Sequence, residues 1–371
     1  MDEKEFDLMI EQALKDGVTE LDLSSTWLTP LPPKLWQLTN LTLLDLSDND
    51  LETLPAEIKH LTNLTTLKAT WSVLDTLPPE IGQLTNLTSL DLSKNLLNTL
   101  PAEIGQLTNL AELSLAGNRL DTLPPEIGQL TNLTSLDLSK NQLRTLPAEI
   151  GQLTNLTRLN LTWNDLDTLP PEIGQLTNLT HLDITSNPLS ELPKECGQLT
   201  NLTELNLYHN QLRTLPPEMG ELTNLSKLNL YGNQLNTLPP EIGKLTNLTV
   251  LSLHWNQLNV LPPEICQLTN LTELSLAGNQ LNVLPTEIRQ LTNLTKLDLR
   301  DNFLPIPPEI LSRIDEAATI IESYLRAVKS PTRGMEALFR EYTWPSYKAR
   351  VSKPFGRSTS PSKLKAEIAG T

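Results

Sequence analysis

Residues 123–143 read LPPEIGQLTNLTSLDLSKNQL, and close variants of this segment recur in strict register from about residue 18 to residue 304. The recurrence has a period of 23 residues, with Asn in one fixed slot of eleven copies. Thr26 and Ser72 fill that slot in two further copies, so the chain holds 13 copies. A fixed period of this size predicts a solenoid, in which each copy buries its apolar side against the next.

The pattern L-x-x-L-x-L-x-x-N inside each copy is the signature of a leucine-rich repeat. In the quoted copy, Leu136 and Leu138 alternate with polar residues, which predicts a short strand with both leucines facing inward. Asp137 and Ser139 then lie on the opposite, concave face. Pro147 excludes a regular helix on the outer side. The predicted fold is an α/β leucine-rich repeat solenoid, with a curved parallel β-sheet on the concave face and loops and short helical turns on the convex face.

The Asn slot follows each predicted strand, at the point where the chain turns. An Asn side chain can both donate and accept hydrogen bonds, so it can pair backbone groups that the turn leaves unpaired. We therefore expect the Asn side chains to stack from copy to copy.

Both ends of the repeat array carry helical patterns, as an open solenoid requires caps. Apolar residues at helical spacing, ended by Gly17, predict an N-terminal capping helix over residues 1–17. The solenoid of 13 copies, period 23, is expected over residues 18–304. Pro308 then opens one C-terminal capping helix within residues 305–328. Its apolar face is Ile310, Ile314, Ala317, Ile321, Leu325 and Val328.

The last segment, residues 329–371, differs in composition from the rest. It holds nine Lys or Arg against three acidic residues, with Ser, Pro and Gly scattered through it. Such a composition is typical of a basic, mostly flexible tail.

Charge and composition limit the partners and the location. The formal net charge is −16, and residues 1–302 carry 37 acidic against 17 basic residues, which disfavours binding of nucleic acid. No run of about 18 apolar residues occurs, which predicts no integral membrane segment. The start MDEKEFDLMI lacks the pattern of a secretory signal, and Cys196 and Cys266 stand three copies apart, too far for a disulfide. A cytoplasmic location is therefore expected.

Between residues 41 and 302 the chain has five aromatic residues, all in the two positions immediately before the Asn slot. Three of the four histidines also fall in the strand segments. Amphipathic rings on an exposed sheet are typical anchors of protein interfaces, while drift on a tolerant face is the alternative explanation. The candidate partner-binding residues, in copies seven to eleven, are Trp163, His181, Tyr208, His209, Tyr231, His254 and Trp255.

The sequence disfavours catalysis and metal binding. The histidines stand on different strands without a matched Cys or acidic ligand, and no zinc spacing is present. Glu recurs at 23-residue spacing from Glu57 to Glu287, but equivalent carboxylates of this kind are typical of a solvated surface. The nucleotide-binding motif G-x-x-x-x-G-K-[ST] is absent, and Gly243-Lys244-Leu245 is an ordinary copy with Lys for Gln. We predict a protein that is not an enzyme and needs no metal and no cofactor.

The unit L-P-x-E-I-x-x-L-x-x-L resembles the intracellular leucine-rich repeats of Ras-group scaffolds such as Erbin and of their plant relatives. The N-terminal stretch IEQALKDGVTELDLSSTWLTPLPPKLWQLTNL and the later segment PPEILSRIDEAATIIESYL resemble bacterial, especially cyanobacterial, Roco-type proteins. The resemblance covers residues 1 to about 328. A GTPase domain usually follows in Roco proteins, but here only a segment of some forty residues with an excess of Lys and Arg remains, so GTP hydrolysis is not implied.

The resemblance implies recognition of a protein partner, possible partners being a small GTPase or another signalling protein. Our first hypothesis is a non-enzymatic protein–protein interaction module, an intracellular signalling scaffold or regulator that binds its partner on the concave face. The alternative is the recognition arm of a split signalling enzyme, with a GTPase or kinase recruited through the basic tail.

Overall fold

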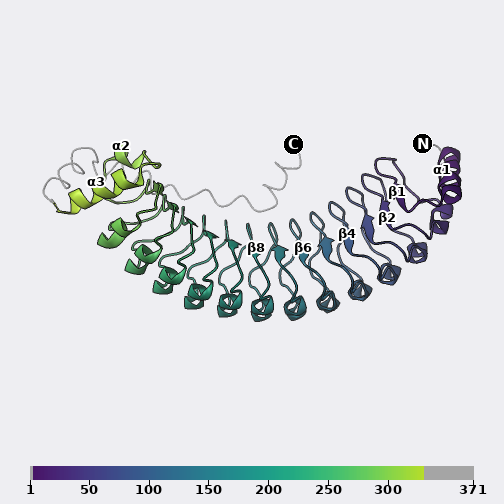
Figure 1. The fold of residues 1–371 in the computed structure, drawn as a ribbon, viewed down its shortest axis with the longest axis horizontal. Helices are drawn as coiled ribbons and strands as arrows, with labels where there is room; N and C mark the ends of the chain where they lie inside the picture. Colours follow the sequence, from purple (N-terminus) through teal and green to yellow (C-terminus); the bar gives the residue numbers. More distant parts are fainter. Residues whose placement is uncertain (1–2, 330–371) are drawn as a thin grey trace.

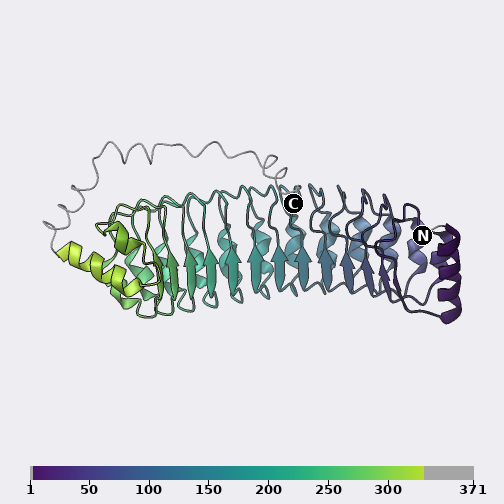
Figure 2. The same ribbon diagram turned by 90° about the horizontal axis from the view of Figure 1, so that it is seen from above.

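The structure, a computed structural model, describes residues 3–329 and forms one curved solenoid (Figure 1). Thirteen parallel strands make one sheet, in which the strands follow one another in sequence order from β1 to β13. The sheet lines the concave side and a row of 3-10 helices lines the convex side (Figure 1, Figure 2). The predicted α/β leucine-rich repeat architecture is therefore confirmed, including the short helical turns on the convex face.

Every strand has three residues. The strands are β1 (Glu20–Asp22), β2 (Leu43–Asp45), β3 (Thr66–Lys68), β4 (Ser89–Asp91), β5 (Glu112–Ser114), β6 (Ser135–Asp137), β7 (Arg158–Asn160), β8 (His181–Asp183), β9 (Glu204–Asn206), β10 (Lys227–Asn229), β11 (Val250–Ser252), β12 (Glu273–Ser275) and β13 (Lys296–Asp298).

The convex 3-10 helices have five residues each and alternate with the strands. They are η1 (Pro33–Gln37), η2 (Ala56–His60), η3 (Pro79–Gln83), η4 (Ala102–Gln106), η5 (Pro125–Gln129), η6 (Ala148–Gln152), η7 (Pro171–Gln175), η8 (Lys194–Gln198), η9 (Pro217–Glu221), η10 (Pro240–Lys244), η11 (Pro263–Gln267) and η12 (Thr286–Gln290).

The sheet keeps one register along its whole length. Leu136 pairs with Leu159, and each other strand residue likewise pairs with the residue 23 positions on. Leu136 and Leu138 are buried, with 1% and 0% of their surface exposed, as predicted. Ser139, which was predicted on the concave face, is only 8% exposed. Because the offset between paired residues equals the repeat period, residues in one slot of the repeat form continuous columns on the surface.

The 3-10 helices pack closely because their fourth residue is Gly in η3 to η10. A Cβ atom added to Gly151 would lie 2.6 Å from the backbone oxygen of Glu172 in the next helix. Such a distance is far inside van der Waals contact. The glycine is therefore required by the approach of two backbones, a role that its place in the repeat did not predict.

The Asn side chains form the expected ladder at the turn after each strand. Asn141 Nδ2 donates to Leu138 O in its own turn and to Leu115 O in the preceding copy, both at 3.0 Å. Leu120 N of the preceding copy donates to Asn141 Oδ1 at 3.0 Å. Asn141 is 1% exposed. Each buried Asn therefore ties its copy to the one before it.

The ladder is interrupted at two places among the described residues. Ser72 takes the Asn slot in copy three, and its buried Oγ has no hydrogen-bond partner. Asn210 is present in copy nine, but its Oδ1 also has no partner. In the ladder, the Asn oxygen accepts an N–H from the preceding copy, as Asn141 Oδ1 does from Leu120 N. The equivalent donor for Asn210 would be Leu189 N. Leu189 directly follows Pro188 in the preceding turn.

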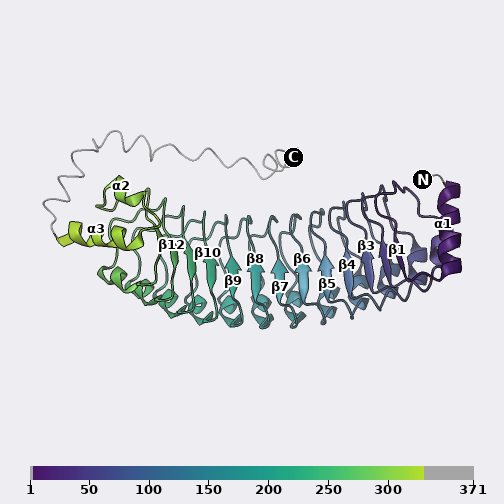
Figure 3. The same cartoon turned by 45° about the horizontal axis from the view of Figure 1, so that its top comes forward.

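The N-terminal end of the solenoid is covered by α1 (Glu3–Asp16), which buries Phe6, Ile10 and Ala13 against the first copy. Gly17 follows the helix with φ = +61°, a left-handed conformation that glycine adopts at little cost. Figure 3 shows α1 standing beside β1 at one end of the sheet.

The C-terminal end differs from the single helix that we expected within residues 305–328. The structure has two helices, α2 (Pro308–Leu311) and α3 (Ala317–Lys329). Between them the chain turns, and Ile314 O accepts a hydrogen bond from Leu297 N at 2.8 Å. Leu297 lies on β13, the edge strand, so Ile314 O supplies the acceptor that a fourteenth copy would otherwise provide.

The buried face of α3 also differs from the predicted one. Ala317 and Ile321 are buried as expected, but Val328 is 42% exposed, and Ile320 and Tyr324 lie in the core instead. Tyr324 Oη donates to Leu284 O and accepts from Leu284 N, both at 2.8 Å. Tyr324 therefore closes the open end of the core and satisfies both backbone groups of Leu284.

Replacement of a helix glycine should destabilise the solenoid. We expect Gly151→Ala to lower the free energy of unfolding by roughly 1–3 kcal/mol, because the added methyl must push apart η6 and η7. Denaturant unfolding followed by circular dichroism measures the change. Lys59→Ala, at the same slot of η2, is the matched control and should change stability by no more than about 0.5 kcal/mol. Equal effects of the two substitutions would contradict the packing argument.

Completion of the Asn ladder should stabilise the protein. We expect Ser72→Asn to raise the free energy of unfolding by about 1 kcal/mol, because the amide would replace an unpaired buried hydroxyl and bond the neighbouring turn. Asn95→Ser in the next copy is the reverse change and should lower stability by a similar amount, since Asn95 bonds Ala69 O and Leu74 N. Denaturant midpoints of both variants check the expectation, and a loss of stability in Ser72→Asn would refute it.

Candidate partner-binding face

The concave face presents side chains in columns that run across the strands. On β10 and its continuation, Lys227, Asn229 and Tyr231 point to this face, while Leu228 and Leu230 are buried. The residues in the same slots of neighbouring copies lie on either side, because the sheet register is constant. The strands follow one another directly along the concave side (Figure 3). A column is therefore a row of side chains about 4.8 Å apart.

The aromatic residues of copies nine to eleven use this spacing to form a stack. Tyr208 and Tyr231 lie with ring centroids 4.8 Å apart and an interplanar angle of 23°. Tyr231 meets His254 edge-on at 5.7 Å, and Tyr208 meets His209 at 5.7 Å. All four side chains are half-buried or exposed. The stack is thus a rigid, partly open apolar surface with polar edges.

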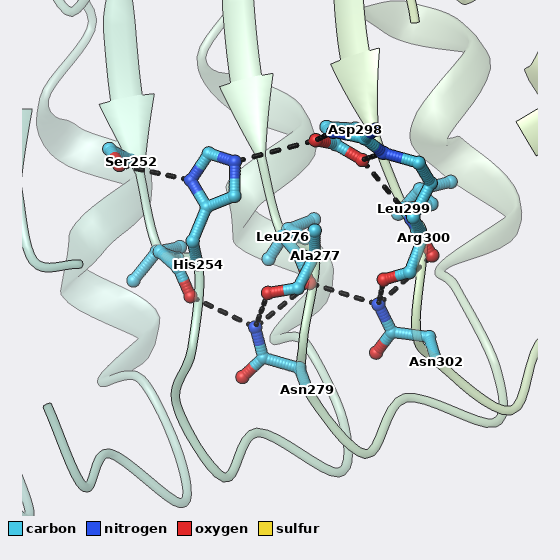
Figure 4. A network of polar contacts seen from close by, with 10 residues as sticks. Ser252, His254, Leu276, Ala277, Asn279, Asp298, Leu299, Arg300 and Asn302 are labelled. Carbon is cyan, nitrogen blue, oxygen red and sulfur yellow. Dashed lines mark hydrogen bonds and ion pairs between the residues drawn. The ribbon is translucent and has the colours of Figure 1, made fainter. Parts of the chain in front are cut away.

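His254 extends the stack to a charged pair two strands away (Figure 4). Its Nε2 lies 3.5 Å from Asp298 Oδ2, and its Nδ1 lies 3.3 Å from Ser252 Oγ. Arg300 donates to Asp298 through Nε at 2.8 Å and through Nη2 at 2.6 Å. The strand between them is β12, where Ser275 and Ala277 occupy the facing positions. Because those side chains are small, the imidazole of copy eleven reaches the carboxylate of copy thirteen.

Asp298 is 5% exposed and carries a charge that its neighbours stabilise. Burial alone would raise the pKa of its carboxyl group. The hydrogen bonds from the Arg300 side chain and from His254, together with the backbone N–H of Arg300, outweigh burial and hold the pKa well below its usual range. Asp298 is therefore an ionised group that orients Arg300 at the edge of the face.

The position immediately before each Asn is left-handed along the array. The backbone φ angles there include 58° at Trp163, 56° at His209 and 52° at Trp255. A bulky residue seldom adopts this conformation, and Gly117, Gly232 and Gly278 fill the same slot elsewhere. A Cβ added to Gly278 would lie 2.9 Å from the Trp255 ring, so the indole lies over the neighbouring copy.

The structure brings only part of the candidate set together. Tyr208, His209, Tyr231 and His254 form the continuous stack, and Trp255, 43% exposed, follows His254 in sequence. We refer to these five residues as the aromatic ladder.

Two candidates lie apart from the aromatic ladder. Trp163 is in copy seven, two strands before Tyr208. His181 is the first residue of β8, whereas the residues of the aromatic ladder follow the ends of their strands. It lies between Arg158 and Glu204 of the neighbouring strands, with Nδ1 2.9 Å from Thr180 Oγ1.

Asp298 and Arg300 were not among the sequence candidates. The signal was present, since Arg300 is the single Arg in its column and stands two residues after an Asp of the strand. The contact with His254 could not be found from the sequence, because it depends on reach across an intervening strand.

The described residues include no group placed to hold a metal ion, and both of their thiols are buried. Within residues 3–329, no group of three His, Cys, Asp or Glu side chains is placed to hold a metal ion. Cys196 and Cys266 are both buried and free. Burial raises the pKa of Cys196 to about 12 and that of Cys266 to about 11, so both thiols stay protonated and unreactive at neutral pH. No helix in the same range is long and apolar enough to cross a membrane.

Comparison with known proteins defines the class. Leucine-rich-repeat family models match residues 40–61, 70–120, 108–166, 177–235, 200–258 and 246–304. Together these matches cover more than half of the chain, so the protein belongs to the leucine-rich repeat family. A search of curated protein sequences gives no match.

Among solved structures, a leucine-rich-repeat protein of Leptospira interrogans is 41% identical, and the match covers 82% of this chain and 95% of that one, with a TM-score of 0.52. Small differences in rotation per repeat accumulate along a solenoid, so high identity is compatible with a modest score. A TDR receptor is 34% identical with a TM-score of 0.68, and this chain spans about half of it (52%). The internalin InlF of Listeria monocytogenes, 24% identical with a TM-score of 0.67, shares the fold.

The Asp298–Arg300 pair should make stability depend on acid pH. We expect Asp298→Asn to lower the free energy of unfolding at pH 7 by roughly 1–3 kcal/mol, because a charge-assisted pair is lost at a buried site. The pKa of Asp298 is depressed in the folded state, so its contribution is complete above the ordinary value of 3.8 and disappears as pH falls further.

The stability gap between wild type and Asp298→Asn should therefore shrink below about pH 4. Urea unfolding of both proteins between pH 7 and pH 2.5 measures this gap. Asp137→Asn, at the same strand position with Ser139 in place of an Arg two residues on, is the matched control. A gap for Asp298→Asn that does not change with pH would show that the carboxylate charge is not responsible.

Proposed function

We propose that the protein is a non-enzymatic binding module that holds a protein partner on its concave face, with the aromatic ladder as the central anchor. The observation that carries this proposal is the stacking of Tyr208, Tyr231 and His254 in neighbouring copies, just after β9, β10 and β11. These rings stay half-exposed, although most other copies carry Ser, Thr or Ala in the same column.

The geometry suits recognition of a protein surface. Tyr, Trp and Arg are the residue types that contribute most at protein interfaces, because they combine large apolar area with a polar end. Here they directly follow short strands of one continuous sheet, so little conformational freedom remains to be lost on binding. Arg300, fixed by two hydrogen bonds to Asp298, adds an oriented charge at the edge of the aromatic ladder.

Relatives support binding of a protein or peptide. Leucine-rich repeat proteins commonly act as protein-interaction modules. A plant peptide hormone receptor, RGFR1, which was solved in complex with RGF2, is 32% identical to this chain with a TM-score of 0.50. The match covers 76% of this chain and 55% of the receptor chain, so the receptor's activity does not transfer as a whole.

The finer role that we propose is that of a cytoplasmic signalling scaffold or regulator, with a small GTPase or other signalling protein as partner. The supporting observation is the resemblance of the repeat unit and of both ends to Ras-group and Roco-type proteins. In this proposal residues 18–304 form the body, residues 1–17 and 305–328 cap it, and residues 329–371 form a separate segment. The alternative role as an arm of a split enzyme depends on residues after Lys329, which lie outside the described part of the chain.

Removal of three rings from the aromatic ladder should weaken partner binding without unfolding the solenoid. We expect the combined change Tyr208→Ala, Tyr231→Ala and Trp255→Ala to reduce capture of bound proteins at least tenfold, since a loss of about 1.4 kcal/mol already gives that factor. Affinity capture followed by quantitative mass spectrometry, with wild type in parallel, measures the loss.

The control for this experiment is Trp71→Ala. Trp71 stands in the same left-handed slot as Trp255 and is 64% exposed, but it lies in copy three, far from the aromatic ladder. Capture by this variant should equal that of wild type, and the circular dichroism of both variants should be unchanged. Equal capture by wild type and by the triple variant would defeat the proposal.

A further inference from the structure

The C-terminal segment, residues 330–371, has a composition that complements the concave face. It carries eight Lys or Arg against three Glu, whereas residues 1–302 carry a large excess of acidic residues. It also contains as many aromatic residues as the whole stretch from residue 41 to residue 302. These are Phe339, Tyr342, Trp344, Tyr347 and Phe355.

The aromatic residues of this segment are followed directly by positive charge. The sequence from Tyr342 to Arg350 is YTWPSYKAR, with three rings within six residues and then Lys348 and Arg350. Rings followed by positive charge suit a surface on which an apolar patch is bordered by carboxylates, because the rings can pack on the patch and the cations can pair with the carboxylates.

The concave face offers such a surface in the same order. The aromatic ladder occupies copies nine to eleven, and carboxylates follow toward the N-terminus. Asp183 lies on β8 and Asp137 on β6, and neither forms a salt bridge with a Lys or Arg within residues 3–329. Asp183 accepts a hydrogen bond from Asn206 at 3.0 Å, which places it beside the strand that carries Tyr208. Beyond the ion-paired Glu273 and Asp298, a chain that crosses the face from its C-terminal end therefore meets the rings first and Asp183 and Asp137 second.

The distances allow the segment to reach this face. Figure 2 shows α3 running outward, with its Lys329 end at the extremity of the molecule. The chain must return past 13 helical residues, about 20 Å, and then cross the two strand spacings from β13 to β11, about 10 Å. At about 3.3 Å per extended residue, this path takes roughly nine residues, so the segment from Lys329 to Tyr342 is long enough to place Tyr342 beside copy eleven. From Tyr342 to Arg350, about 26 Å more, the chain would cross roughly five further strand spacings and reach β6.

We propose that residues 342–350 bind within the same chain to the concave face, with Tyr342, Trp344 and Tyr347 against the aromatic ladder and with Lys348 and Arg350 beside Asp183 and Asp137. The bound segment then occupies the surface that the protein partner requires, and it lowers the apparent affinity of the concave face for that partner. This inference rests on the proposed function, since it assigns a regulator to the same site. The connection through α3 favours binding in the same chain over binding between copies, because a short tether gives a local concentration in the millimolar range.

Photo-crosslinking of the full chain tests the placement. Trp344 is replaced by p-benzoylphenylalanine, the protein is irradiated at low concentration, and crosslinked peptides of the monomer are identified by mass spectrometry. The expected products join position 344 to peptides that contain Tyr208, Tyr231 or His254. Their yield should fall at least fivefold when Tyr208→Ala and Tyr231→Ala are added, and also when Lys348→Glu and Arg350→Glu are added. Trp71→Ala, outside the aromatic ladder, should leave the yield unchanged.

Three results would overturn the inference: no crosslink to strands β9 to β11, crosslinks confined to the convex helices, or crosslinks found only in dimers, which would mean binding between copies. A second measurement tests the regulatory effect. Tyr342→Ala, Trp344→Ala and Tyr347→Ala together should raise capture of bound proteins by about tenfold, as expected when a competing tethered segment is removed. Unchanged or lower capture would exclude competition by the segment.

These outcomes separate the inference from the proposed function. If the crosslink is absent while substitution of the aromatic ladder still abolishes capture, the C-terminal segment is not the regulator but the concave face binds partners. If the crosslink is present while substitution of the ladder leaves capture unchanged, the face binds its own C-terminal segment and the partner site lies elsewhere.

Discussion

The buried Asn after each strand is the constraint on which the rest of the structure depends. Its side chain donates to a carbonyl of its own turn and to one of the preceding turn, and it accepts an N–H from the preceding copy. Water is excluded there, so each of these backbone groups would otherwise be unpaired at a cost of about 1–3 kcal/mol. The Asn therefore fixes both the shape of the turn and the distance between copies, and the period of 23 residues is set by this recurrence.

The same turn decides how side chains reach the surface. It requires a left-handed residue before the Asn, and the structure places glycine there in three copies and tryptophan in three others. The position before it continues the strand on the concave face, where Tyr208 and Tyr231 stack at the strand spacing. A regular scaffold thus makes rows of equivalent positions, and function depends on which positions depart from the small polar residues found elsewhere in the row. Ser72 and Pro188 show that the scaffold tolerates single interruptions of the ladder without a break in the sheet.

The C-terminal end of the array shows why a local sequence pattern was insufficient to predict the capping helices. Residues 308–328 have apolar residues at helical spacing, and this spacing predicted one helix. The structure interrupts it because β13 is an edge strand, and Ile314 O pairs with Leu297 N while Tyr324 pairs with both backbone groups of Leu284. The requirement to satisfy an exposed edge arises only after thirteen copies have stacked, so a helical pattern in one segment cannot reveal it.

The sequence by itself determined the solenoid, its parallel sheet, the Asn ladder and the column in which the aromatic residues stand. All of these recur every 23 residues, so the sequence of a single copy is enough to predict them. The tertiary structure alone decided which candidates meet. It joined Tyr208, His209, Tyr231 and His254, and it added Asp298 and Arg300 through a contact over the small residues of β12. It also kept Trp163 and His181 apart from that group. The physical reason is that a side chain reaches across a neighbouring strand only when the side chains on that strand are small. This contact therefore depends on three copies together, and the sequence of any one copy does not reveal it.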